Sequence, residues 1–129
     1  MKYLKLFFRN YTKFSGRANR SEYWFAALWL FIINALGSLP FLIIGALMSD
    51  DGSGTLIGLS FYYIFAVIWA IICILPSIAI SIRRMHDTNR SGAWILINLV
   101  PFIGSIIFFI ITILPSTDGP NNYGDPSLE

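Results

Sequence analysis

The chain has 129 residues, of which 56% are hydrophobic and 12% are charged. Ordinary soluble domains carry roughly 25% charged residues, so this composition excludes a domain whose whole surface faces water. The formal net charge is +2, but six of the nine cations lie before position 21 and the other three lie between positions 83 and 90. The single cysteine, Cys73, excludes an internal disulfide, and no zinc-type Cys/His spacing occurs.

Residues 2–15 are predicted to form an amphipathic helix, because aromatic and basic side chains alternate between two faces at steps of three and four. Such a helix can lie in the membrane interface, where each cation near anionic lipid contributes about 1 kcal/mol. It can also pack on the protein's own polar segments, and the two arrangements are compatible. Asn19 is a candidate N-cap for the next helix, with Glu22 three residues further on.

Three long runs without a charged side chain follow, at positions 23–49, 52–82 and 91–117. About 20 apolar helical residues cross the hydrocarbon core, so the sequence predicts transmembrane helices at about 23–48, 56–82 and 93–114. A polar tail, 115–129, is dense in turn-forming residues, and no helix is expected there.

The third run allows two interpretations, because Pro101-Phe102-Ile103-Gly104 falls inside it. One is a single kinked helix that crosses the membrane. The other is a re-entrant hairpin that turns at 101–104 and leaves on the side it entered. We favour the full crossing, because non-helical backbone at membrane depth needs cover from protein or water.

The distribution of cations predicts the orientation, since loops rich in Lys and Arg remain cytoplasmic. The N-terminal segment has six cations and the polar hinge (residues 83–92) has three, whereas the loop after the first run and the tail have none. Three spans with a cytoplasmic N-terminus and a periplasmic C-terminus satisfy every loop. The predicted fold class is therefore all-α: one polytopic membrane domain with three transmembrane helices and an N-terminal amphipathic interfacial helix.

Four segments carry recognisable motifs: FSGRANRSEYW at 14–24, RRMHDTNRSG at 83–92, PFIG at 101–104 and GPNNYGDP at 119–126. Together they resemble a bacterial inner-membrane family known as domain of unknown function 805, over nearly the whole chain. Ala93 departs from the pattern, since the family more often has an aromatic residue there. The resemblance implies a small multi-pass protein of the bacterial inner membrane, and it implies no reaction.

The polar hinge and the segment before the first run hold the candidate functional residues. Their cations predict a site for an anion or a lipid headgroup, because guanidinium forks match phosphate; the set is Arg17, Arg20, Arg83, Arg84, His86 and Arg90. Glu22 and Asp87 are candidates for structural ion pairs with these arginines. Asp87 has four possible partners: Arg84, Arg90, Arg17 and Arg20. Glu22 can form an ion pair with another of the arginines.

Catalysis and metal binding are not expected in the polar hinge. His86 and Asp87 are adjacent, and neighbours on a helix point about 100° apart. A metal site needs three or more ligands, and Ser91 is assigned to the N-cap of the third helix. No cofactor is expected, and Asn34 and Asn98, inside the uncharged runs, are interpreted as helix–helix hydrogen-bond partners.

These patterns indicate a small integral inner-membrane protein with a structural or regulatory role, whose basic cytoplasmic face binds anionic membrane lipids or a protein partner. One alternative is an oligomeric transporter or channel subunit, with Asn34 and Asn98 lining a path. Another is a lipid-headgroup enzyme at the polar hinge. A homo-oligomer or a membrane protein partner fits these hypotheses, and no nucleic-acid partner is expected.

Overall fold

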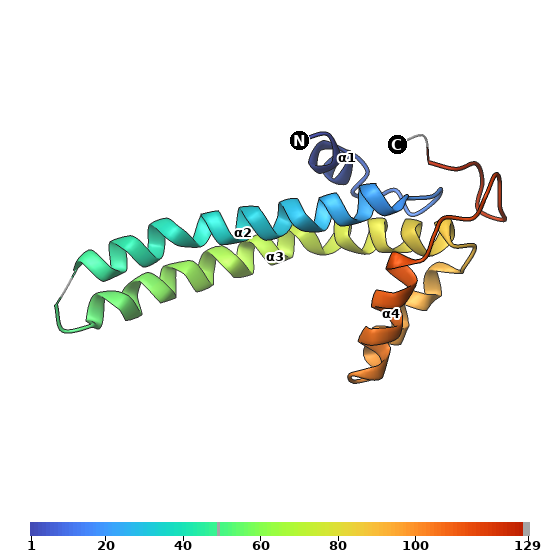
Figure 1. Cartoon of the computed structure of the whole chain (residues 1–129). Helices are drawn as coiled ribbons and strands as arrows, with labels where there is room; N and C mark the ends of the chain where they lie inside the picture. Colours follow the sequence, from blue (N-terminus) through green and yellow to red (C-terminus); the bar gives the residue numbers. More distant parts are fainter. Residues whose placement is uncertain (49, 128–129) are drawn as a thin grey trace. The chain divides into compact units, whose positions relative to one another are not determined.

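The computed structural model describes residues 1–48 and 50–127, and its regular elements are all helices (Figure 1). In chain order they are α1 (Lys2–Arg9), α2 (Arg20–Met48), α3 (Ser53–Asp87), the 3-10 helix η1 (Gly92–Leu99) and α4 (Ile103–Ile113). The chain divides into two compact units. We call residues 28–74 the hairpin unit, and residues 1–27 with 75–129 the terminal unit. The predicted tail, 115–129, lies within the described residues only as far as residue 127.

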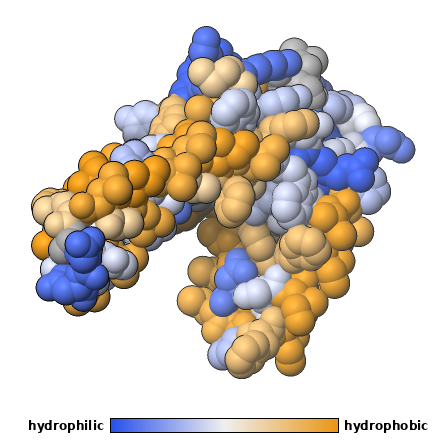
Figure 2. Space-filling view, turned by 60° about the vertical axis from the view of Figure 1, so that its left-hand side comes forward, coloured by the Kyte–Doolittle hydropathy of each residue, from blue (hydrophilic) through white to orange (hydrophobic). Residues whose placement is uncertain are grey.

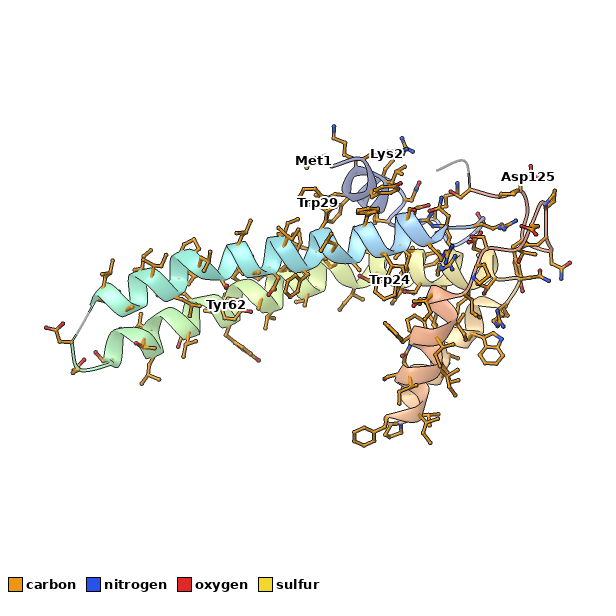
Figure 3. The ribbon with its side chains drawn as sticks, viewed as in Figure 1. Met1, Lys2, Trp24, Trp29, Tyr62 and Asp125 are labelled. Carbon is orange, nitrogen blue, oxygen red and sulfur yellow. The ribbon has the colours of Figure 1, made fainter. Side chains whose placement is uncertain are left out.

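The hairpin unit consists of the second part of α2 and the first part of α3, packed through small residues. A Cβ atom on Gly58 would lie 2.4 Å from the carbonyl oxygen of Phe41, so only glycine allows this backbone approach. Nearer the middle, the Tyr62 hydroxyl donates to Oδ1 of Asn34 at 3.2 Å; Figure 3 labels this tyrosine. Asn34 therefore forms a hydrogen bond between the two helices.

Both long helices expose apolar side chains over most of their length. Within the most apolar stretch, 6% of α2 and 22% of α3 is buried, and the helices have 29 and 35 residues. About 20 residues suffice to cross a bilayer, so both are long and apolar enough to span. Figure 2 shows hydrophobic side chains on much of the visible surface. A helix that is apolar on its outer face is stable where its surroundings are lipid or other protein.

Several helix ends differ from the predicted bounds, and the start of α2 follows the capping pattern. Helix α1 ends at Arg9, not near residue 15, because the chain turns at 10–13. Helix α2 begins at Arg20, where Oδ1 of Asn19 accepts from the backbone N–H of Glu22 at 2.7 Å, as the capping pattern predicted. Helix α3 continues to Asp87 instead of ending near residue 82. The first half of the polar hinge is therefore the last turn of a transmembrane-length helix.

The third uncharged run is not one helix, and the predicted single kinked helix over 93–114 was wrong. Pro101 has no N–H for a helix, and it biases Val100 toward extended backbone (φ −81°, ψ 116°). Phe102 then adopts φ 61° and ψ −63°, and the Ile103 N–H donates to the Pro101 carbonyl at 2.7 Å. This is the rare positive-φ γ-turn. It reverses the chain, so η1 and α4 form a hairpin that turns at residues 101–104, as in the second of the two predicted arrangements.

The two arms of this hairpin touch at Gly104. A Cβ atom there would lie 1.7 Å from the carbonyl oxygen of Ile97, a position that no side chain can occupy. The arms contain 8 and 11 residues, and each is shorter than the roughly 20 residues of a span. Residues at the turn are highly exposed, Phe102 by 86% and Leu99 by 79%. The hairpin thus has an apolar tip.

We expect Gly104→Ala to separate the two arms, because the added methyl group overlaps a backbone oxygen that cannot rotate away. Overpacking of this kind typically costs about 1–3 kcal/mol. The measurement is the thermal unfolding midpoint of the purified chain in detergent micelles. Ser105→Ala is the matched control: its side chain is exposed, and it should change stability by less than about 0.5 kcal/mol. Equal midpoints for the two variants would contradict the close approach.

Candidate functional site

Among the described residues of the terminal unit, five charged side chains are almost completely buried. We call them the charge cluster: Arg17 (5% exposed), Glu22 (2%), Arg83 (3%), Arg84 (0%) and Asp87 (1%). Burial of unpaired charge is costly, so each of these groups requires partners inside the protein. This arrangement, with charge inside and apolar side chains outside, is the reverse of a soluble domain.

Asp87 is the centre of the cluster. Its Oδ1 accepts from Nε of Arg17 at 2.9 Å, and its Oδ2 accepts from Nη1 of Arg84 at 2.5 Å and from the Ser116 hydroxyl. Arg17 lies 70 positions before Asp87 in the sequence and Ser116 lies 29 after it. One carboxylate at the end of α3 therefore joins three separate segments of the chain.

The last carbonyls of α4 are bound by side chains from α2 and α3. A helix leaves its final carbonyls without intrahelical donors and carries a partial negative charge there. Arg84 donates through Nε to the Thr112 carbonyl at 3.0 Å and through Nη2 to the Leu114 carbonyl. Trp24 (Figure 3) donates its indole N–H to the same Thr112 carbonyl at 3.3 Å, and Arg20 reaches the Ile113 carbonyl at 3.5 Å. These donors fix the C-terminal end of α4 next to the charge cluster.

The polar tail is bound to the same place. Arg17 donates through Nη1 to the Gly119 carbonyl and through Nη2 to the Thr117 carbonyl, both at 2.7 Å. The Thr117 N–H donates in turn to the Asp87 carbonyl at 2.9 Å. The sequence-based prediction of three spans separated this tail from the polar hinge, and so it missed Ser116 and Thr117. Their position beside Asp87 follows only if the chain reverses at Pro101 and Phe102.

His86 has a packing and tethering role in this geometry. Its Nδ1 lies 3.0 Å from the Gly16 carbonyl, and its ring stacks on that of Tyr123, with centroids 4.1 Å apart and planes 3° apart. Asn121 donates to the His86 carbonyl at 2.9 Å. Ser91 accepts from the Ala93 N–H at 3.3 Å as the N-cap of η1, as predicted. These contacts do not form a nucleophile and base pair.

Arg83 is the least satisfied member of the charge cluster. Its Nη1 donates to Oε1 of Glu22 at 2.6 Å, and its carbonyl accepts from the Ala18 N–H at 3.0 Å. Its Nε and Nη2 atoms are buried and have no hydrogen-bond partner among residues 1–48 and 50–127. The cluster contains three guanidinium groups and two carboxylates, so its formal charge is +1.

The remaining candidate residues lie outside the charge cluster. Arg20 is exposed, and Arg90 is half-buried with Nη1 donating to the Thr88 carbonyl at 3.2 Å. Asn98 is exposed and donates to the Ile95 carbonyl of its own helix at 3.0 Å. Within residues 1–48 and 50–127, no group of three or more His, Cys, Asp or Glu side chains could hold a metal ion.

A second feature of the terminal unit is a basic groove, which the sequence analysis did not single out. It is an open cavity of about 430 Å³ lined by Lys2, Lys5, Leu6 and Arg9 of α1. Leu6, which lines the groove, and its neighbour Phe7 are both buried, and Tyr3 stacks on Phe25 of α2 at 5.1 Å. Cations of this chain thus occur in two environments, one buried and one exposed.

Comparison with known proteins identifies the family. A model described as "Protein of unknown function (DUF805)" matches residues 11–125. The chain belongs to the DUF805 family. It is 40% identical over 121 residues to inner membrane protein YhaI of Escherichia coli strain K12, covering 93% of this chain and 91% of that protein. It is 37% identical over 129 residues to inner membrane protein YhaH of the same strain, covering 98% and 97%. No solved structure matches this DUF805 chain.

These relatives and the two long apolar helices agree on the setting of this DUF805 protein. Both relatives are named as inner membrane proteins, and α2 and α3 have the length and composition of membrane spans. The chain is therefore an integral protein of the inner membrane. The resemblance inferred from the motifs at 14–24, 83–92, 101–104 and 119–126 is confirmed by the family match.

We expect Asp87→Asn to destabilise the protein strongly, because it leaves two buried guanidinium groups without a counter-charge. Removing one partner of a buried ion pair typically costs about 3–5 kcal/mol. The measurement is the thermal unfolding midpoint in detergent micelles. Asp118→Asn makes the same chemical change on the exposed tail and should leave the midpoint nearly unchanged. If both variants unfold at the wild-type temperature, Asp87 does not organise the cluster.

Proposed function

We propose that this DUF805 protein is a two-span, non-enzymatic membrane protein that concentrates anionic phospholipid at the cytoplasmic surface, in a structural or regulatory role. The separation of its cations supports this proposal. The buried arginines are engaged by carboxylates and carbonyls, whereas Lys2, Lys5 and Arg9 line an open groove. Cations beside exposed rings suit the headgroup region of a membrane.

The proposed topology has both termini in the cytoplasm, in place of the periplasmic C-terminus expected from three spans. All nine cations belong to the terminal unit, and segments rich in Lys and Arg remain cytoplasmic. The hairpin of η1 and α4 brings Thr117 back to Asp87 at the end of α3. The loop between α2 and α3 carries Asp50 and Asp51 and no cation, which suits the periplasmic side.

The basic groove is the part of the surface best suited to anionic headgroups. Lys2, Lys5 and Arg9 follow one another at steps of three and four, so they share a face of α1. Each cation close to an anionic membrane contributes about 1 kcal/mol, and three together give an attraction worth roughly a hundredfold in affinity. The buried Leu6 and Phe7 hold α1 against the protein, so the groove is presented as a fixed surface.

The two alternative functions receive less support. A headgroup enzyme at the polar hinge needs a free base, but His86 contacts the Gly16 carbonyl and the Tyr123 ring. A transporter subunit needs polar groups that face a path. Asn34 instead accepts from Tyr62 of the neighbouring helix, which favours a packing role for it. Asn98 bonds the Ile95 carbonyl of its own helix, which contradicts the predicted helix–helix bond.

The topology is tested by cysteine accessibility in a background that carries Cys73→Ala. We expect Asp50→Cys to react with a membrane-impermeant maleimide in intact spheroplasts, because the loop between α2 and α3 faces the periplasm. Asn122→Cys, in the tail, should react only after the membrane is opened. Both positions are exposed, so the comparison is matched. Labelling of Asn122→Cys in closed spheroplasts would restore the three-span topology.

The lipid proposal is tested by measuring the affinity of the detergent-purified chain for phosphatidylglycerol by native mass spectrometry. Lys5→Gln removes a cation from the basic groove and should weaken binding about fivefold, equivalent to about 1 kcal/mol. Lys13→Gln removes the same charge from an exposed loop outside the groove and should have a smaller effect. Equal effects would indicate attraction by net charge alone, and no effect of either would reject the proposal.

A further inference from the structure

We propose that the unpaired edge of the Arg83 guanidinium is a binding site for a phosphate-type oxyanion. The side chain of Arg83 is 4% exposed, yet Nε and Nη2 have no hydrogen-bond partner. Buried guanidinium donors normally find acceptors, because an unsatisfied charged donor carries its full desolvation cost. The structure therefore presents donors for which the described part of the chain supplies no acceptor.

The geometry of the free edge selects the class of ligand. Glu22 takes only Nη1, through a single contact at 2.6 Å. The Nε–H and one Nη2–H of an arginine point in parallel and form a two-pronged fork, which matches two oxygens on one phosphorus or one carboxylate carbon. Because the membrane surface is rich in phosphate groups, a phosphate or phosphodiester is the ligand that this edge would meet. Its source can be a lipid headgroup or free phosphate.

The charge of the cluster supports an anion as well. Arg17 and Arg84 both contact Asp87, and their other donors reach carbonyls such as those of Thr117 and Thr112. The only ion pair of Arg83 within the charge cluster is with Glu22. The cluster has three cations and two anions, so one positive charge is unbalanced. An oxyanion on Arg83 would remove this excess and satisfy both free donors. The site is separate from the basic groove, which is lined by Lys2, Lys5, Leu6 and Arg9.

The experiment uses the full chain in an uncharged detergent, with thermal unfolding as the readout, because a ligand that binds the folded state raises its stability. Inorganic phosphate and short-chain phosphatidylglycerol are titrated separately. We expect a saturable rise in the midpoint with at least one of them. A rise with both that Arg83→Lys removes assigns the site to any phosphate oxyanion, and a rise with the lipid alone that Arg83→Lys removes assigns it to a headgroup. No rise with either overturns the proposal.

Two variants locate the effect at Arg83. Arg83→Lys keeps the positive charge and one contact to Glu22 but removes the two-pronged edge, and it should weaken binding roughly tenfold or more. Glu22→Gln leaves the edge intact and removes a negative charge, so it should strengthen binding several-fold. The second variant keeps the proposal falsifiable if the first folds poorly. Unchanged affinity in both variants would place the anion elsewhere.

The same assay separates this site from the proposed function. Lys5→Gln should leave the response to inorganic phosphate unchanged, because the basic groove is not part of the Arg83 site. If Lys5→Gln has no effect on phosphatidylglycerol while Arg83→Lys abolishes the phosphate response, the groove proposal fails and the Arg83 site stands. The opposite pattern rejects the Arg83 site and retains the groove.

Discussion

The carboxylate of Asp87 is the constraint on which the terminal unit depends. It is 1% exposed and binds Arg17, Arg84 and Ser116 at once. A buried ion pair is not by itself a strong source of stability, since desolvation offsets much of its attraction. Its effect here is to define positions: the N-terminal segment, the end of α3 and the tail must all come to one point, or a buried charge is left without a partner.

The same network explains how a hairpin with a strained turn is tolerated in a membrane protein. Irregular backbone at membrane depth needs hydrogen-bond partners inside the protein. In the hairpin formed by η1 and α4, the turn and the helix ends are the places where backbone groups lack helical partners. Gly104 lets the arms pack against each other, and Arg84 covers the carbonyls of Thr112 and Leu114. What remains exposed is the apolar tip at Leu99 and Phe102. Such a tip is compatible with lipid, whereas the polar ends of the hairpin have partners inside the protein.

Much of this architecture follows from local features of the sequence, and the rest does not. The three uncharged runs predict three long apolar helices, of which α2 and α3 are found, and the Asn19–Glu22 spacing predicts the start of α2. Pro101 marks an interruption, but a proline in an apolar run can kink a helix or reverse it. The outcome depends on the contact between Gly104 and Ile97 and on the reach of Arg84 to the end of α4. These are long-range contacts that hydropathy does not encode, and the tail's contribution to the site was missed for the same reason.

The orientation of the N-terminus and the number of spans are separate questions. The charge distribution therefore predicts the same orientation whether the chain crosses the membrane two or three times. All nine cations fall in the terminal unit whether the third run crosses or returns, so the side assigned to the N-terminus depends only on the positive-inside rule. The side of the C-terminus depends on whether the number of crossings is odd or even. The hydrogen bond from Thr117 to Asp87, at 2.9 Å, forms because the hairpin of η1 and α4 returns the chain to the end of α3. A tail held to the end of α3 lies on the same side of a membrane as that end, so this contact supports the proposed topology with an even number of crossings.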